Sequence, residues 1–81
     1  MESRIAVVGI ALEDRTKSSQ AVNEILGSYG DMIVGRLGIP YRDRNISIIS
    51  VIVDGSNDEI GALTGKLGNL KGVKTKVSVM Y

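Results

Sequence analysis

The residues best suited to bind a ligand are a few charged side chains beside predicted strands. Asp14 and Arg15 follow an apolar run, at the position where a helix is expected to begin. An outward-facing helix N-terminus presents free backbone N–H groups, which bind small ligands. Arg36 lies in a second apolar segment, where its guanidinium is placed to hold an anion or reach another subunit, or simply to extend from an edge strand into water. We take Asp14, Arg15 and Arg36 as the candidate ligand-binding residues, although helix capping alone also explains Asp14.

Three glycines follow one line of a helix predicted to begin at Ser56 and to run to about Leu70. Gly61, Gly65 and Gly68 are spaced i, i+4 and i+7, far around the helix from its leucine stripe. Each glycine costs about 1 kcal/mol relative to alanine inside a helix. One explanation is that another backbone or a ligand approaches this surface closely. The alternative is that the surface is exposed and its residues are only loosely constrained. We treat the three glycines as a candidate partner-binding surface.

The composition removes the common catalytic groups. The chain has no His and no Cys, so it lacks an imidazole base, a thiolate nucleophile and the usual ligands of structural zinc. No serine lies in a nucleophile-elbow motif, no pair of carboxylates has a convincing spacing, and no phosphate-binding loop occurs. We therefore expect no enzymatic activity, no metal and no cofactor.

The charge and the apolar runs limit the partners. The net charge is +1, from ten basic and nine acidic residues, so the attraction to nucleic acid is weak. There is no Phe or Trp to stack on bases and no basic recognition helix. Apolar runs such as Ile5–Leu12 fall far short of the ~20 residues of a membrane span, and the polar start does not resemble a signal peptide. We expect a soluble cytoplasmic protein that binds neither nucleic acid nor membrane.

The hydrophobic pattern predicts a βαββαβ order over a single domain, residues 1–81. Strands are expected at Ile5–Leu12, Met32–Ile39, Ile46–Val53 and Val73–Met80. The first helix is capped by Asp14 and ended by Gly30 in a left-handed conformation, and the second begins with a capping box formed by Ser56 and Glu59. Right-handed crossovers then give an α+β, ferredoxin-like fold: a four-stranded antiparallel sheet with both helices on one face.

The strands differ in whether one or both of their faces must be buried against other elements. The first and third are apolar at nearly every position, which predicts central strands; the second, ended by Pro40, and the fourth, which carries lysines, are expected at the edges. In the second strand Ile33, Leu37 and Ile39 share one parity.

The third strand carries two apolar sets of opposite parity, and only one of them can point at the helices. The sets are Ile46, Ile48 and Ile52, and Ile49, Val51 and Val53. The other set is exposed unless another copy of the chain packs against it. Burial of each such side chain contributes roughly 1.5–3 kcal/mol of favourable free energy. We therefore expect a homodimer or homotetramer, formed through the open sheet face or by edge pairing.

Parts of the sequence resemble a known family. The segments are Gly35–Arg42 (GRLGIPYR), Asp58–Gly68 (DEIGALTGKLG) and Gly72-Val73-Lys74. They look like the ACT-like family of anaerobic bacteria that is proposed to regulate the iron-only hydrogenase system, and the resemblance spans nearly the whole chain. It implies an ACT-like ferredoxin fold, dimers or tetramers, and a regulatory role beside hydrogenase genes. The family is also similar in fold to the nickel-binding domain of a nickel-responsive repressor, whose ligands are mainly His and Cys.

These observations lead to one hypothesis and two alternatives. We expect a non-enzymatic ACT-like regulatory module that self-associates and binds a small-molecule effector or a protein partner. ACT-like dimers typically hold ligands at subunit interfaces near the first βα loop, which contains Asp14 and Arg15. The alternatives are a transcriptional regulator that binds DNA directly, and a small dimeric ferredoxin-like enzyme with an enclosed cavity and a perturbed carboxylate.

Overall fold

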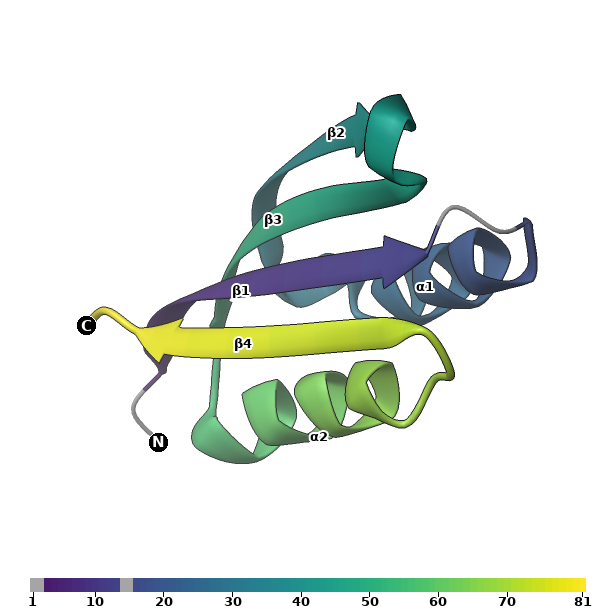
Figure 1. Ribbon diagram of the computed structural model, residues 1–81. Helices are drawn as coiled ribbons and strands as arrows, with labels where there is room; N and C mark the ends of the chain where they lie inside the picture. The colour runs from purple at the N-terminus through teal and green to yellow at the C-terminus, as the bar shows by residue number, and fades with distance from the viewer. Residues whose placement is uncertain (1–2, 14–15) are drawn as a thin grey trace.

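The computed structural model describes residues 3–13 and 16–81. The helices and strands are β1 (Arg4–Glu13), α1 (Thr16–Ser28), β2 (Ile33–Tyr41), β3 (Ile46–Gly55), α2 (Asn57–Gly68) and β4 (Val73–Val79). Two single-turn 3-10 helices, η1 (Gly30–Met32) and η2 (Arg42–Arg44), flank β2. The strands form one antiparallel sheet, and both helices pack on the same face of it (Figure 1). The predicted βαββαβ, ferredoxin-like α+β fold is confirmed.

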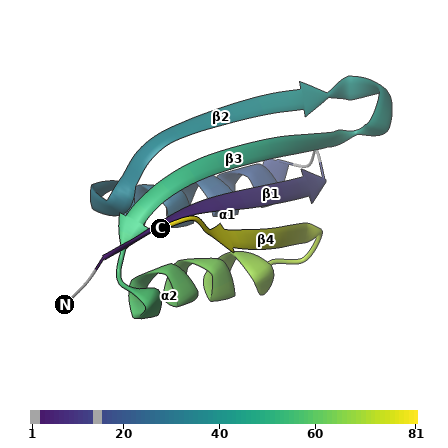
Figure 2. The ribbon, with the colours of Figure 1, turned by 90° about the vertical axis from the view of Figure 1, so that its left-hand side faces the viewer.

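The strand order in the sheet is β2-β3-β1-β4. The two strands that are apolar at nearly every position, β1 and β3, are therefore central, as their composition predicts. Figure 2 shows β2 and β4 at the two edges of the twisted sheet. Pro40 does not end β2 as predicted: it pairs with Ser47, and the strand continues to Tyr41. An edge strand tolerates proline, because it has a neighbouring strand on one side only.

The core lies between the sheet and the two helices. Its buried side chains are Ala6, Val8, Ile10, Leu12, Val22, Leu26, Met32, Ile49, Val51, Val53, Ile60, Leu63 and Leu67. The register pairs Ala6 with Val53 and Ile10 with Ile49, so even positions of β1 and odd positions of β3 share the helix side. Of the two apolar sets on β3, the set containing Ile49 faces the helices.

The start of α2 forms the capping box that the sequence predicts. The hydroxyl of Ser56 accepts a hydrogen bond from the backbone N–H of Glu59 at 3.1 Å, and the Glu59 carboxylate accepts one from the N–H of Ser56 at 2.9 Å. These bonds satisfy two N–H groups that the helix itself cannot pair. The corresponding cap predicted at Asp14 for α1 lies outside the described residues.

The predicted left-handed cap at Gly30 is wrong. The helix α1 ends at Ser28, and the chain continues into η1, where Gly30 keeps a negative φ. The N–H of Met32 donates to the carbonyl of Tyr29 at 3.0 Å, which brings the Met32 side chain into the core. A 3-10 turn thus replaces the left-handed residue at this helix end.

The shared parity predicted for β2 is also wrong, because the strand contains a β-bulge. Ile33 pairs with Val53 and Gly35 pairs with Ile52, so Val34 is an extra residue without a counterpart on β3. The extra residue shifts the alternation by one position. Ile33 therefore lies on the helix side, whereas Leu37 and Ile39 lie on the opposite side.

Candidate functional site

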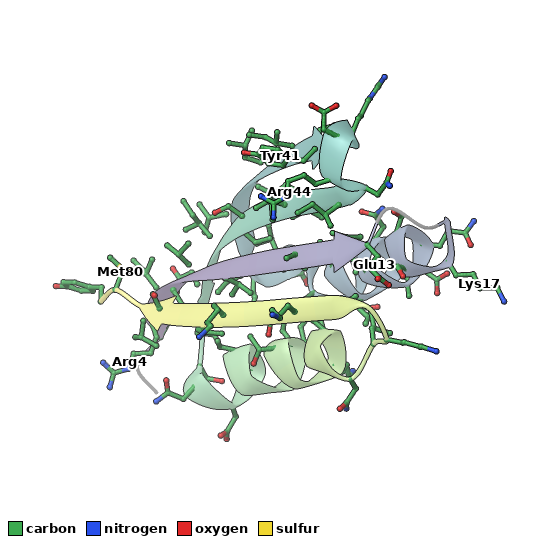
Figure 3. All side chains as sticks on the ribbon, viewed as in Figure 1. Arg4, Glu13, Lys17, Tyr41, Arg44 and Met80 are labelled. Atoms are coloured by element: carbon green, nitrogen blue, oxygen red, sulfur yellow. The ribbon has the colours of Figure 1, made fainter. Side chains whose placement is uncertain are left out.

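The side of the sheet that faces away from the helices is largely apolar, and we call it the open face. By register it carries Ile5, Val7, Gly9 and Ala11 of β1, Leu37, Ile39 and Tyr41 of β2, and Ile46, Ile48 and Ile52 of β3. Leu37 is 63% exposed and Ile52 is 43% exposed. Tyr41 adds its ring at the end of the sheet where η2 joins β2 to β3 (Figure 3). The open face thus exposes an apolar surface over three adjacent strands, larger than the singly scattered apolar residues of an ordinary surface.

Charged side chains border this apolar area. Lys74 and Lys76 of β4 lie on the open face beside Ala11 and Gly9 of β1. Asp54 pairs with Ile5 at the other end of the sheet and adds a negative charge. The open face therefore has an apolar centre with charges of both signs at its margin.

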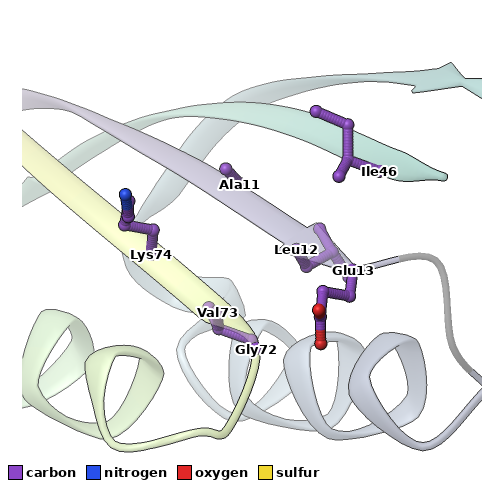
Figure 4. Close-up of a pocket in the computed structure, with 7 residues that line it drawn as sticks. All are labelled: Ala11, Leu12, Glu13, Ile46, Gly72, Val73 and Lys74. Carbon is purple, nitrogen blue, oxygen red and sulfur yellow. The ribbon is translucent and has the colours of Figure 1, made fainter. Parts of the chain in front are cut away.

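A hollow of about 360 Å³ lies where the open face meets the turn before β4. Figure 4 shows Ala11 and Lys74 pointing away from the helices, while the side chain of Glu13 turns toward Gly72. Ile46 closes the hollow on the β3 side. Because Ala11 and Ile46 also belong to the open face, the hollow deepens that face.

A second depression lies on the other side of the sheet, between α1 and strands β2 and β3; we call it the helix-side groove. It has a volume of about 280 Å³ and is lined by Leu12, Ser19, Asn23, Arg36, Gly38, Ile39, Pro40, Ser47 and Ile49. Leu12 and Ile49 are buried core residues, so they provide an apolar floor. The polar residues come from both α1 and the sheet.

Arg36 lines this groove as an exposed side chain and contacts a side chain of α1. Its register opposite Val51 places it on the helix side, and its Nη2 atom donates a hydrogen bond to Oδ1 of Asn23 at 3.1 Å. Gly38, two positions along the strand, also lines the groove, and a methyl group there would make an ordinary contact with Cγ1 of Ile49 at 3.6 Å. The groove thus combines one anchored cation with apolar walls.

The structure places one of the three predicted ligand-binding residues in this groove. Arg36 lines it, whereas Asp14 and Arg15 lie outside the described residues, and the ligand-binding role of all three stays a prediction. Sequence reasoning missed Ser19, Asn23 and Ser47. All three lie in the layer between α1 and the sheet. The sequence alone does not show this, because it does not determine which side of β3 faces the helices.

The three glycines of α2 lie on an exposed surface. A methyl group on Gly61 or Gly65 would have no atom of another part of the chain within 4 Å, and one on Gly68 would reach Oγ1 of Thr75 at 4.0 Å. The helix therefore has room for close approach along this line. Its use as a partner-binding surface stays a prediction.

The described part of the chain contains neither a metal-binding cluster nor a helix that could cross a membrane. Within residues 3–13 and 16–81, no three His, Cys, Asp or Glu side chains gather in a metal-binding arrangement. Neither described helix has the length and apolar character to cross a membrane.

Comparison with known proteins finds relatives over almost the whole chain. A family model, "TM1266-like: Iron-only hydrogenase system regulator, putative", matches residues 4–77. The structure of uncharacterized protein TM1266 from Thermotoga maritima superposes with a TM-score of 0.97 at 40% identity, covering 99% of this chain and 100% of that chain. A crystal structure of an unknown protein from Galdieria sulphuraria has a TM-score of 0.70 at 18% identity, and shares the fold over 99% of this chain and 46% of that chain.

No curated protein matches the sequence. The family model covers most of the chain, and the identity to TM1266 extends over its full length. The resemblance drawn from the glycine-rich segments is thereby confirmed, and the chain belongs to the TM1266-like family.

Proposed function

We propose that the protein is a non-enzymatic, ACT-like regulatory module of an iron-only hydrogenase system, which self-associates through its open face and binds a small molecule or a protein. The family's description supports the regulatory role. The observation that carries the self-association is the open face, because its leucine and isoleucine side chains remain exposed after both helices have packed.

The energetics favour covering this face. Burying one such side chain fully contributes roughly 1.5–3 kcal/mol, and several lie side by side on β2 and β3. A twofold interface doubles the gain, because the same residues of each copy become buried. A domain of 81 residues with no cysteine has a small core and no disulfide to stabilise it, so burial of this surface by association would add to its stability.

A second copy of the chain is the occupant that best fits the margins of the face. Lys74 and Lys76 lie on one edge of it, and Asp54 lies on a central strand. A surface with both signs of charge around an apolar centre is complementary to itself in a twofold pair. The lysines also discourage strand addition at the β4 edge, which favours stacking over edge pairing.

Analytical ultracentrifugation at micromolar concentration tests the self-association. The wild type is expected to sediment as a dimer or tetramer, and Ile52→Lys, on the open face, as a monomer. Val79→Lys is the matched control: Val79 is 55% exposed, but it pairs with Ala6 on the helix side of the sheet. A monomeric wild type, or an Ile52→Lys variant that assembles as the wild type does, would refute association through this face.

A gel-shift assay separates this role from direct DNA binding. With a net charge of +1, the protein is expected to leave a hydrogenase promoter fragment unshifted at moderate salt. A shift that persists as the salt is raised, and that competitor DNA of unrelated sequence does not remove, would favour a DNA-binding regulator.

A further inference from the structure

We infer that the helix-side groove binds a small monocarboxylate with a compact apolar body, and that such a compound is the effector of the proposed regulatory module. The effector role rests on the proposed function. The binding site rests on the geometry of the groove alone.

The anionic end of the ligand is assigned by Arg36. The hydrogen bond to Asn23 holds the guanidinium beside the groove at 3.1 Å, which reduces the entropy lost when a ligand binds. That bond uses one N–H of a group that has five, arranged in a planar fork. Such a fork matches the two oxygens of a carboxylate, and this pairing is among the stronger hydrogen-bonded contacts in proteins.

The charge and size of the groove narrow the class of ligand. Among residues 3–13 and 16–81, Arg36 is the one charged residue that lines it, which matches a single negative charge better than a polyphosphate. The volume of about 280 Å³ lies just below the range of drug-sized sites, roughly 300–1,000 Å³, so the ligand must be small. A ligand with one carboxylate and a few carbon atoms fits both limits.

The apolar body of the ligand is assigned by the floor and walls. Leu12 and Ile49 form a buried floor, and Pro40 adds an apolar wall. Gly38 has no side chain, and a carbon atom at the position of its Cβ would stand 3.6 Å from Ile49, so apolar ligand atoms can contact Ile49 there. Burial of that group supplies the binding energy that a single exposed ion pair does not.

The same strands serve the groove and the open face. Arg36 and Gly38 line the groove, while Leu37, between them in sequence, points to the open face. On β3, Ser47 and Ile49 alternate with Ile48 in the same way. A ligand that orders these segments changes the surface offered to a second copy, and each binding event then alters the affinity of the other.

Titration with 3-methylbutanoate, followed by nuclear magnetic resonance, tests the site. Saturable shifts are expected at residues of the groove, whereas 3-methylbutanamide, which has nearly the same shape without the charge, should bind up to about fivefold more weakly, because the ion pair it lacks is exposed. Inorganic phosphate should produce no saturable shift in the groove. Equal binding of the amide, or no saturation by the carboxylate, would overturn the assignment.

Substitutions locate the binding to the groove. Arg36→Ala is expected to weaken binding of 3-methylbutanoate by about two- to fivefold, and Arg36→Lys, which keeps the charge but loses the planar fork, by less. Arg44→Ala, an exposed arginine of η2, is the matched control and should bind as the wild type does. Ser47→Leu fills the groove and keeps Arg36; binding that survives both Ser47→Leu and Arg36→Ala would refute the site.

The effector role can be refuted without refuting the binding site or the self-association. Sedimentation with saturating 3-methylbutanoate should shift the association constant of the wild type and leave that of Arg36→Ala unchanged. An unchanged wild-type constant, with binding intact, overturns the effector role alone. A wild type that stays monomeric, with binding intact, overturns the self-association and leaves the carboxylate site standing.

Discussion

The side chain of Glu13 occupies the space that a side chain at position 72 would need. The backbone N–H of Glu13 donates to the carbonyl of Gly72 at 3.0 Å, and a methyl group on Gly72 would overlap the Glu13 carboxylate. Gly72 also has a φ of 77°, in the left-handed region. Sterics and backbone conformation thus both require glycine in the turn that leads into β4.

Gly72→Ala is therefore expected to lower the free energy of unfolding. The left-handed backbone alone costs a residue with a Cβ roughly 1–2 kcal/mol, and displacing Glu13 adds to that. Urea denaturation at fixed protein concentration measures the loss. Gly30→Ala is the matched control: it has a negative φ and open space around it, and should change stability little. Equal effects of the two substitutions would contradict the structure.

Gly65→Ala should act in the opposite direction. Gly65 lies inside α2 with no other part of the chain within 4 Å of an added methyl group. Alanine is favoured over glycine there by up to about 1 kcal/mol. Thermal unfolding should show a higher midpoint for the variant. A lower midpoint would mean that another surface already packs against the glycine line, as the partner-binding hypothesis holds.

Ser56→Ala tests the capping box. The substitution removes the bond from the Glu59 N–H and leaves the return bond without its reciprocal partner, so a loss of about 1 kcal/mol is expected. Ser28→Ala is the comparison: its hydroxyl donates to the carbonyl of Glu24 on an exposed surface, and its removal should cost less than about 0.5 kcal/mol. Chemical denaturation resolves the difference, and a larger loss for Ser28→Ala would count against the assigned cap.

Leucines on the two sides of the sheet should behave differently. Leu63 of α2 is fully buried, so Leu63→Ala is expected to cost about 2–5 kcal/mol at any protein concentration. Leu37 lies on the open face, so Leu37→Ala should weaken assembly and leave the unfolding of dilute protein almost unchanged. Denaturation at two protein concentrations distinguishes them. A concentration-independent loss for Leu37→Ala would contradict its place at an interface.

The features that local chemistry determines could be predicted from the sequence. The capping box needs only Ser56 and Glu59 at the right spacing. The central places of β1 and β3 follow from apolar residues on both faces, and the edge places of β2 and β4 follow from Pro40 and from the lysines. Each of these inferences depends on residues close together in the chain.

The features that depend on tertiary packing could not be predicted. The end of α1 departs from the expected glycine cap because Met32 packs into the core through η1. The groove around Arg36 needs Asn23 and Ser47, which come from different elements and carry no common motif. Which apolar set of β3 faces the helices is likewise decided by the sheet as a whole.

The extra residue at position 34 has a consequence for insertions and deletions. Without Val34, Ile33 and Gly35 would be consecutive and would still pair with Val53 and Ile52, in an unbroken ladder. The strand would lose its local kink, yet every residue from 35 to 41 would keep its side of the sheet. An insertion or deletion of one residue after the bulge would instead move the side chains of part of the strand to the opposite face of the sheet. Position 34 is thus a point in β2 where chain length can vary while both surfaces of the domain stay as they are.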